Sequence, residues 1–310
     1  MKPSKALKSF RAFLRRKHVK NILIVTILVL TVAVFIHFFA VHPEYIKQLG
    51  KTNPWWIVAV VALNIPMIGL LVLIYDVCLA LCSKHLEWKE NFLLTSYSSI
   101  VNFFGPLQSG PGVRAGYLKT RHQVRLRDYT LATLIYYGMF AFFSALFLFA
   151  GALVWWQTVL CLAAVAGFSY YLIRTFVKRD KKPRESQFHL HGPLLARLAI
   201  LTFLQVLLTA ITYFVELKAV NPHIVWSQAV SYAGAANFAL FVSLTPDAIG
   251  FREAFLVFSQ HLHHVSTANI LSANIIDRGS YVIFLCLLFL VVLATHAKDK
   301  LRLGSLRRTG

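Results

Sequence analysis

Two arginines each follow a break in a hydrophobic segment, and arginine is the side chain best suited to holding a phosphate-like anion. Arg114 lies in residues 102–115 (NFFGPLQSGPGVRA), and Arg252 lies in residues 237–254 (NFALFVSLTPDAIGFREA). A planar guanidinium can make two parallel hydrogen bonds to one phosphate or carboxylate. Because a cation within an apolar segment is costly, it marks a functional site by default, usually with an anion nearby. These arginines are therefore the first candidates for an anion-binding site.

The breaks in the two segments add backbone donors beside the arginines. The dipeptide Asn-Phe stands nine residues before Pro111 and again nine residues before Pro246. Where a helix restarts after such a break, its first turn presents unpaired N–H groups and the positive end of the helix dipole. Glycine also lets the backbone approach a ligand closely. The residues expected to shape the two breaks are Pro111, Gly112, Pro246 and Gly250.

Other charged residues in or near the hydrophobic segments are secondary candidates for the same site. They are Glu253, Asp277 and Arg278. A second interpretation needs no ligand: Arg252 pairs with Glu253 or Asp277, and the pair only holds helices together. Asp277 is as well suited to carrying a proton as to bridging two helices by a hydrogen bond. Glu216 falls near the end of a hydrophobic run, so we expect it to be solvated.

The composition excludes an ordinary soluble domain. Of the 310 residues, 57% are hydrophobic and only 14% are charged, and the mean hydropathy is +0.62. The net charge of +20 does not indicate a nucleic-acid partner, because the basic residues lie almost wholly in short segments between apolar runs. That distribution is the positive-inside pattern of a polytopic membrane protein.

No catalytic or metal-binding motif accompanies the arginines. The four cysteines all sit within apolar runs and lack the spacing of metal ligands. One helical face can join His261 to His264 but not to His263, which argues against a metal site. A G-x-S-x-G elbow, an H-E-x-x-H motif, a phosphate-binding loop and a paired-carboxylate arrangement are all missing from the sequence. We therefore predict no catalytic residue, no metal and no cofactor.

The apolar runs predict an all-α polytopic membrane protein with about six transmembrane helices and two re-entrant half-helix hairpins. The spans are residues 21–40, 55–82, 129–154, 157–177, 193–217 and 270–297, and the hairpins are residues 92–119 and 227–265. The basic segments place both termini in the cytoplasm. One hairpin then opens from the cytoplasm and the other from outside, so the two halves form an inverted repeat.

The same runs give the domain boundaries. A basic cytoplasmic segment, residues 1–20, precedes a single integral membrane domain, residues 21–297, and a basic tail, residues 298–310, follows it. The charged linker, residues 178–192, joins the halves 21–177 and 193–297.

The broken segments resemble the paired motifs of the lysylphosphatidylglycerol synthase transmembrane-region family. The motifs are S-G-P-G-V-R-A-G-Y at residues 109–117 and L-T-P-D-A-I-G-F-R-E-A at residues 244–254. The resemblance implies a lipid-handling membrane protein, since the family includes the flippase domain of the multiple peptide resistance factor. Asp247 and Ala248 replace two glycines of the family's Pro-Gly-Gly-x-Gly, which adds a negative charge beside the proposed anion site. No aminoacyl-transferase domain is expected after residue 297.

These observations together predict a flippase or translocase for an anionic or phosphate-bearing lipid in the inner membrane of a bacterial or archaeal cell. Its partner is an anionic membrane lipid and not a nucleic acid. The alternatives are an intramembrane transferase acting on a lipid-linked substrate and a non-transporting membrane subunit. The sequence leaves open the lipid, the direction, the energy source and the oligomeric state, a homo-oligomer included. Head-group binding is predicted for Arg114, Arg252, Gly112, Gly250, Pro111, Pro246, Glu253, Asp277 and Arg278.

Overall fold

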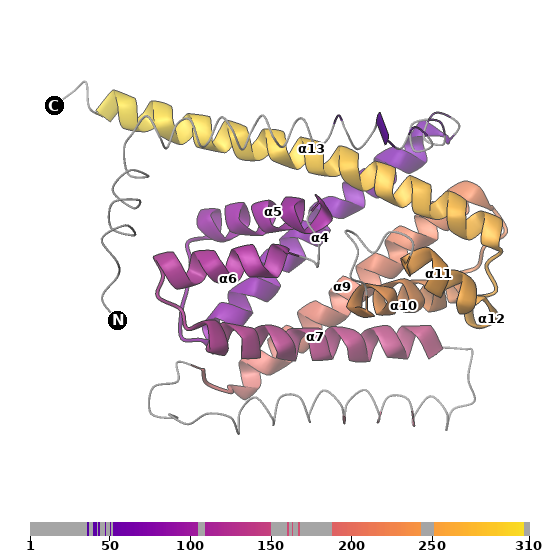
Figure 1. Ribbon diagram of the computed structural model, residues 1–310, viewed down its shortest axis with the longest axis horizontal. Coiled ribbons are helices and arrows are strands. Elements are labelled where there is room, and N and C mark those ends of the chain that lie inside the picture. Colours follow the sequence, from indigo (N-terminus) through magenta and orange to yellow (C-terminus); the bar gives the residue numbers. More distant parts are fainter. Residues whose placement is uncertain are drawn as a thin grey trace. The chain divides into compact units, whose positions relative to one another are not determined.

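The computed structural model describes residues 52–104, 109–149, 188–242 and 251–306, together with a few isolated residues. Contacts divide the chain into two compact units, Met1–Lys47 and Gln48–Gly310, and the fold below is that of the second unit (Figure 1). The predicted basic segment 1–20 and most of the predicted linker lie outside the described residues, and so do the predicted spans 21–40 and 157–177 apart from isolated positions.

Four helices among the described residues are long and apolar enough to cross a membrane. They are α4 Pro54–Leu81, α7 Leu126–Phe149, α9 Gly192–Val220 and the segment Thr267–Thr295 of α13 Thr267–Leu306. Each coincides within a few residues with a predicted span, so these four predictions are confirmed as apolar helices. Proline stands in the first turn of α4 and of α9, where its missing N–H is not needed. The Asn53 Oδ1 also accepts a hydrogen bond from the Trp55 N–H at 3.0 Å, which caps α4.

The shorter helices form two packed groups. α5 Trp88–Phe104 packs against α6 Gly110–Arg121, and α10 Trp226–Val242 packs against α11 Phe251–Phe258 and α12 Gln260–His263. At 12 and 8 residues, α6 and α11 are about 18 Å and 12 Å long, against a hydrocarbon thickness of about 30 Å. Neither of these two helices is long enough to cross a bilayer.

The pairs α5–α6 and α10–α11 start from opposite ends of the α4–α9 pair. The His189 N–H donates to the Leu81 carbonyl oxygen at 2.9 Å, so the end of α4 adjoins the start of α9. α5 begins soon after α4 ends, whereas α10 begins soon after α9 ends. In Figure 1, α5 and α6 accordingly lie together at the left and α10 and α11 at the right, with α4 and α9 running between them. The two short-helix pairs therefore approach the middle of the unit from opposite directions.

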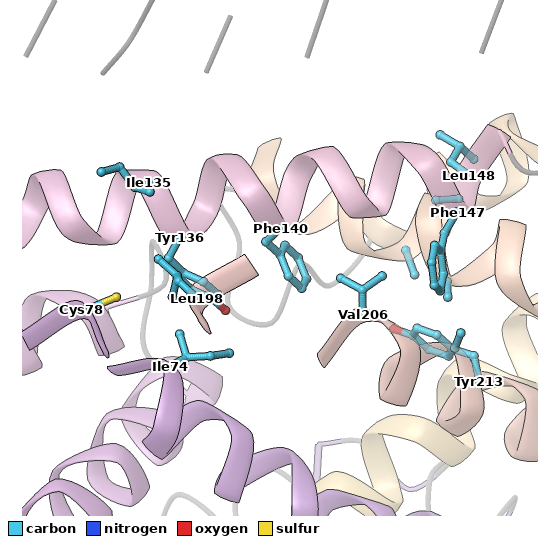
Figure 2. Packing of buried hydrophobic residues seen from close by; sticks show 14 of the residues in the cluster. Ile74, Cys78, Ile135, Tyr136, Phe140, Phe147, Leu148, Leu198, Val206 and Tyr213 are labelled. Carbon is cyan, nitrogen blue, oxygen red and sulfur yellow. The ribbon is translucent and has the colours of Figure 1, made fainter. Parts of the chain in front are cut away.

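The two sequence halves share one hydrophobic core. α9 packs against α4 and α7, and α10 packs against α7. Figure 2 shows Phe140 and Phe147 of α7 pointing toward Val206 and Tyr213 of α9. Because helices of the second half fill the space between helices of the first, the short pairs are held on a common scaffold.

Gly234 lies where α10 meets α7. A Cβ at Gly234 would meet the backbone nitrogen and Cα of Leu148. Only a residue without a side chain permits this approach of two helices.

We expect Gly234→Ala to lower stability by about 1–3 kcal/mol, because the added methyl group forces the α7 and α10 backbones apart. The measurement is thermal unfolding of the purified chain in detergent. Gly116→Ala is the matched control, since a Cβ at Gly116 would meet nothing within 4 Å. Equal unfolding temperatures for the two variants would contradict the close α7–α10 contact.

Candidate functional site

Arg114 is buried completely, with 0% of its surface exposed, and its partners are neutral. Its Nη1 donates to the Thr95 Oγ1 at 2.8 Å, and its Nη2 donates to the Asn91 Oδ1. The guanidinium carbon lies 3.9 Å from the centre of the Tyr75 ring, a cation–π contact. α6 therefore inserts its arginine between α4 and α5.

No carboxylate of the described residues lies within 4.0 Å of Arg114. Its Nε has no hydrogen-bond partner among those residues either. An ion removed from water carries a penalty of several kcal/mol, and neutral acceptors offset only part of it. The Ser109 hydroxyl, at the start of α6, donates to the Val101 carbonyl oxygen at 3.2 Å and does not cap the helix. Within the part of the chain that the structure describes, the beginning of α6 thus carries positive charge with no carboxylate beside it.

A cavity of about 250 Å³ opens beside this first turn. Most of its wall is apolar, and a Cβ at Gly112 would meet nothing within 4 Å. The cavity is lined by Pro111, Gly112 and Ala115 of α6 and by Tyr129, Thr130, Thr133, Leu134 and Tyr137 of α7. Two of the predicted site residues, Pro111 and Gly112, therefore line an apolar space.

Arg252 has a different environment, although it too is buried, with 4% exposed. Its Nη2 lies 2.6 Å from the Asp277 Oδ2, and its Nη1 donates to the Tyr213 hydroxyl at 3.3 Å. A second ion pair joins the Arg278 Nη2 to the Glu253 Oε1 at 2.7 Å. Two ion pairs thus connect α11 to α13, and in one pair the arginine comes from α11, whereas in the other it comes from α13. The pairing of Arg252 with Asp277 is the one named by the interpretation that needs no ligand.

Glu216 is buried completely, so the prediction that it is solvated was wrong. It lies near the end of α9 in sequence, but α10 and α13 pack over that helix. Its carboxyl group faces Asp277 and Arg252. Neither of its oxygens accepts a hydrogen bond from an N–H or O–H of the described residues. Distant segments of the chain, and not the local sequence, exclude water from this acid.

His263 of the histidine cluster has a local role. It is buried in α12, the Val265 N–H donates to its Nδ1 at 3.2 Å, and its Nε2 lies 2.9 Å from the Leu256 carbonyl oxygen. Burial lowers the pKa of His263 to about 4. The neutral ring thereby connects the end of α12 to α11.

The predicted site residues fall into two groups. The structure brings Glu253, Asp277 and Arg278 to Arg252 and brings none of them to Arg114. Pro246 and Gly250 lie outside the described residues. Sequence reasoning did not find Asn91, Thr95, Tyr75 or Tyr213, because neutral residues in apolar helices give no charge signal.

A constant offset along the sequence relates the two arginine sites. The interval from Arg114 to Arg252 is equal to the interval from Tyr75 to Tyr213. The same offset relates the first residues of α4 and α9, and both the first and the last residues of α5 and α10. Tyr75 and Tyr213 each contact the arginine of their own half. This internal register is the signal that could have identified both tyrosines.

The two sites differ in charge at corresponding positions. When positions are matched by the interval between Arg114 and Arg252, neutral residues of the first half correspond to acidic or basic residues of the second half. Cys78, Ala115, Met139 and Phe140 correspond to Glu216, Glu253, Asp277 and Arg278. Among the described residues, Arg114 therefore has neutral partners, whereas Arg252 belongs to a cluster of acidic and basic side chains.

The helices and the buried arginines define a membrane-embedded helical protein with polar groups deep in an apolar core. A family model described as "Lysylphosphatidylglycerol synthase TM region" matches residues 21–288, and the chain belongs to this family. The resemblance stated from the two motifs is thus confirmed. None of the curated proteins compared matches the chain. The family associates the chain with membrane lipids.

The Arg278–Glu253 pair allows a test of the α11–α13 connection. We expect Glu253→Leu to reduce stability by about 3–5 kcal/mol, because it leaves Arg278 buried without this partner. The double variant Glu253→Leu/Arg278→Met should recover most of that loss, since it removes both charges. Unfolding in detergent, followed by intrinsic fluorescence, measures both. A double variant less stable than the single one would contradict the pairing.

Proposed function

We propose that this protein moves an anionic or phosphate-bearing lipid between the two leaflets of a membrane and that Arg114 binds the head group. The observation that carries the proposal is the complete burial of Arg114 without a carboxylate partner in the described residues. A buried cation of this kind is stabilised when an anion reaches it, and a lipid is the anion that a membrane supplies.

The surroundings of Arg114 suit a phosphate group. A guanidinium offers a planar fork to two phosphate oxygens, and the uncapped start of α6 adds the positive end of a helix dipole. The neutral partners Asn91 and Thr95 hold the side chain without cancelling its charge. The apolar cavity lined by Pro111 and Gly112 provides space for hydrocarbon beside the first turn of the helix that carries Arg114.

The arrangement of the short helices suits movement across a bilayer. In the proposal, α5–α6 and α10–α11 are re-entrant hairpins of an inverted repeat, entering from the cytoplasmic and the outer side respectively. Their start from opposite ends of the α4–α9 pair and the internal register of the two halves support it. Such paired breaks can expose one site alternately to each side. The second hairpin would contribute Arg252 and its charged neighbours, in an inner membrane with both termini in the cytoplasm.

The test uses the purified chain in liposomes that contain a labelled anionic phospholipid. Arg114→Gln should lower the rate of lipid redistribution about tenfold or more, because a charge-assisted hydrogen bond contributes about 1.5–3 kcal/mol. Arg114→Lys should retain part of the rate, since the ammonium group keeps the charge but lacks the fork. Lys119→Ala removes an exposed cation from the same helix and is the matched control.

Two results would count against lipid movement by this site. One is a folded Arg114→Gln variant that redistributes lipid at the wild-type rate. The other is a lipid that stays in its leaflet but changes mass when a donor is supplied, which would favour the transferase alternative.

A further inference from the structure

The contact between α6 and α7 is open along part of its length, where the cavity of about 250 Å³ lies. Four of its lining residues carry hydroxyl groups, yet most of its wall is apolar. The Thr133 hydroxyl donates to the Tyr129 carbonyl oxygen of its own helix at 2.7 Å, so this polar group already has a partner. None of the described residues that line the cavity is charged. A polar ligand would lose its hydrogen bonds to water here and gain few in return.

The size of the cavity favours hydrocarbon over water as its occupant. Protein interiors are densely packed, and voids larger than a water molecule are few. An engineered apolar cavity of about 150 Å³ in another protein stays dry and binds benzene, whereas a buried water needs roughly two to four polar partners. The cavity of this chain is larger, and its wall extends about 10 Å along α7, from Thr130 to Tyr137. It therefore has room for a segment of a longer hydrocarbon.

The cavity opens toward the outside of the helix bundle. Gly112 of α6 and Thr130 of α7 line it and are both exposed. Val113, which follows Gly112, is 43% exposed, and Leu126, one turn before Thr130 on α7, is 41% exposed. Because α7 is long and apolar enough to cross a membrane, its exposed side chains face the hydrocarbon of a bilayer. The opening is thus reached from the lipid, and the group that a bilayer supplies there is an acyl chain.

The corresponding helices of the second half are bridged by an ion pair at this place. By the interval that relates Arg114 to Arg252, α6 and α7 correspond to α11 and α13, and Ala115 corresponds to Glu253. Glu253 contacts Arg278 of α13 at 2.7 Å, whereas Ala115 borders the cavity. A small residue thus stands where the second half has a bridging acid. The first half therefore combines the neutral partners of Arg114 with an open apolar space.

We propose that the cavity between α6 and α7 binds one acyl chain of a phospholipid, which enters sideways from the bilayer. The chain passes between Gly112 and Thr130 and lies against the apolar wall that the two helices form. The phospholipid is the one whose head group Arg114 binds, and this part of the inference rests on the proposed function. Because α6 carries both Arg114 and one wall of the cavity, a displacement of this helix moves the two sites together.

The test uses the full chain in liposomes that contain phosphatidylglycerol with a photoreactive diazirine in the middle of one acyl chain. Illumination should attach the lipid to Tyr129 or Thr133, which line the cavity but are buried from lipid at the outer surface. Mass spectrometry identifies the labelled residues. Gly112→Leu should lose this labelling, because a side chain at Gly112 has free space and fills the cavity. Gly116→Leu is the matched control, since Gly116 also has free space but does not line the cavity.

Two further variants test the opening and the chemistry of the wall. Thr130→Trp narrows the opening from the side of α7 and should also remove the labelling. Thr133→Val keeps the shape of the wall and removes only a hydroxyl, so it should retain the labelling. Equal labelling of Gly112→Leu and Gly116→Leu would overturn the proposal. Loss of labelling in a folded Thr133→Val variant would also overturn it, because the site would then depend on a polar contact.

Lipid redistribution separates this inference from the proposed function. Gly112→Leu should slow redistribution, and an unchanged rate would overturn the assignment of the cavity to the lipid that moves. If the labelling behaves as expected but Arg114→Gln redistributes lipid at the wild-type rate, the acyl-chain site stands and the proposed function fails. If Tyr129 and Thr133 stay unlabelled while redistribution still requires Arg114, the proposed function stands and the acyl-chain site fails.

Discussion

The structure depends on the free-energy penalty of keeping charged side chains in an apolar interior. Arg114, Arg252, Arg278 and Glu216 are all nearly or fully buried in a unit whose long helices are otherwise hydrophobic. Such a penalty is offset by an opposite charge, by a bound ion or by a change of protonation. The two halves use different solutions. The second half pairs its arginines with acids, whereas the first surrounds Arg114 with neutral acceptors and an aromatic ring.

The scaffold places this difference on two corresponding sets of helices. α4 and α9 each supply a tyrosine to the arginine of their own half, and the short helices that carry the arginines start from opposite ends of that pair. The two halves therefore share one helical plan but differ in the charges around their arginines. In the proposed function, the first half supplies the positive charge that binds the head group.

The sequence predicted the four long helices well, because a long uninterrupted apolar run has few other stable forms. The arginines could be singled out for the same reason, since their penalty is large wherever they are buried. Glu216 was mispredicted because its burial comes from helices distant in sequence. The two Asn-Phe dipeptides, like Pro111 and Pro246, are separated by a slightly shorter interval than Arg114 and Arg252. Only the interval between the arginines also separates the start of α4 from that of α9 and the start of α5 from that of α10. The motifs therefore indicated a repeat but not the offset that relates corresponding residues of the two halves. Thr95 was not predicted because a helical threonine usually forms a hydrogen bond only with its own backbone.

The most direct measurement of the central claim is a solid-state NMR experiment on the chain in bilayers of an anionic phospholipid, with nitrogen-labelled arginine and the phosphorus of the lipid as the two probes. We expect a guanidinium signal that is dephased by phosphorus at direct hydrogen-bonding distance and that is absent from Arg114→Lys. Retention of every phosphorus contact in that variant, while the protein still moves the lipid, would show that the head group binds elsewhere.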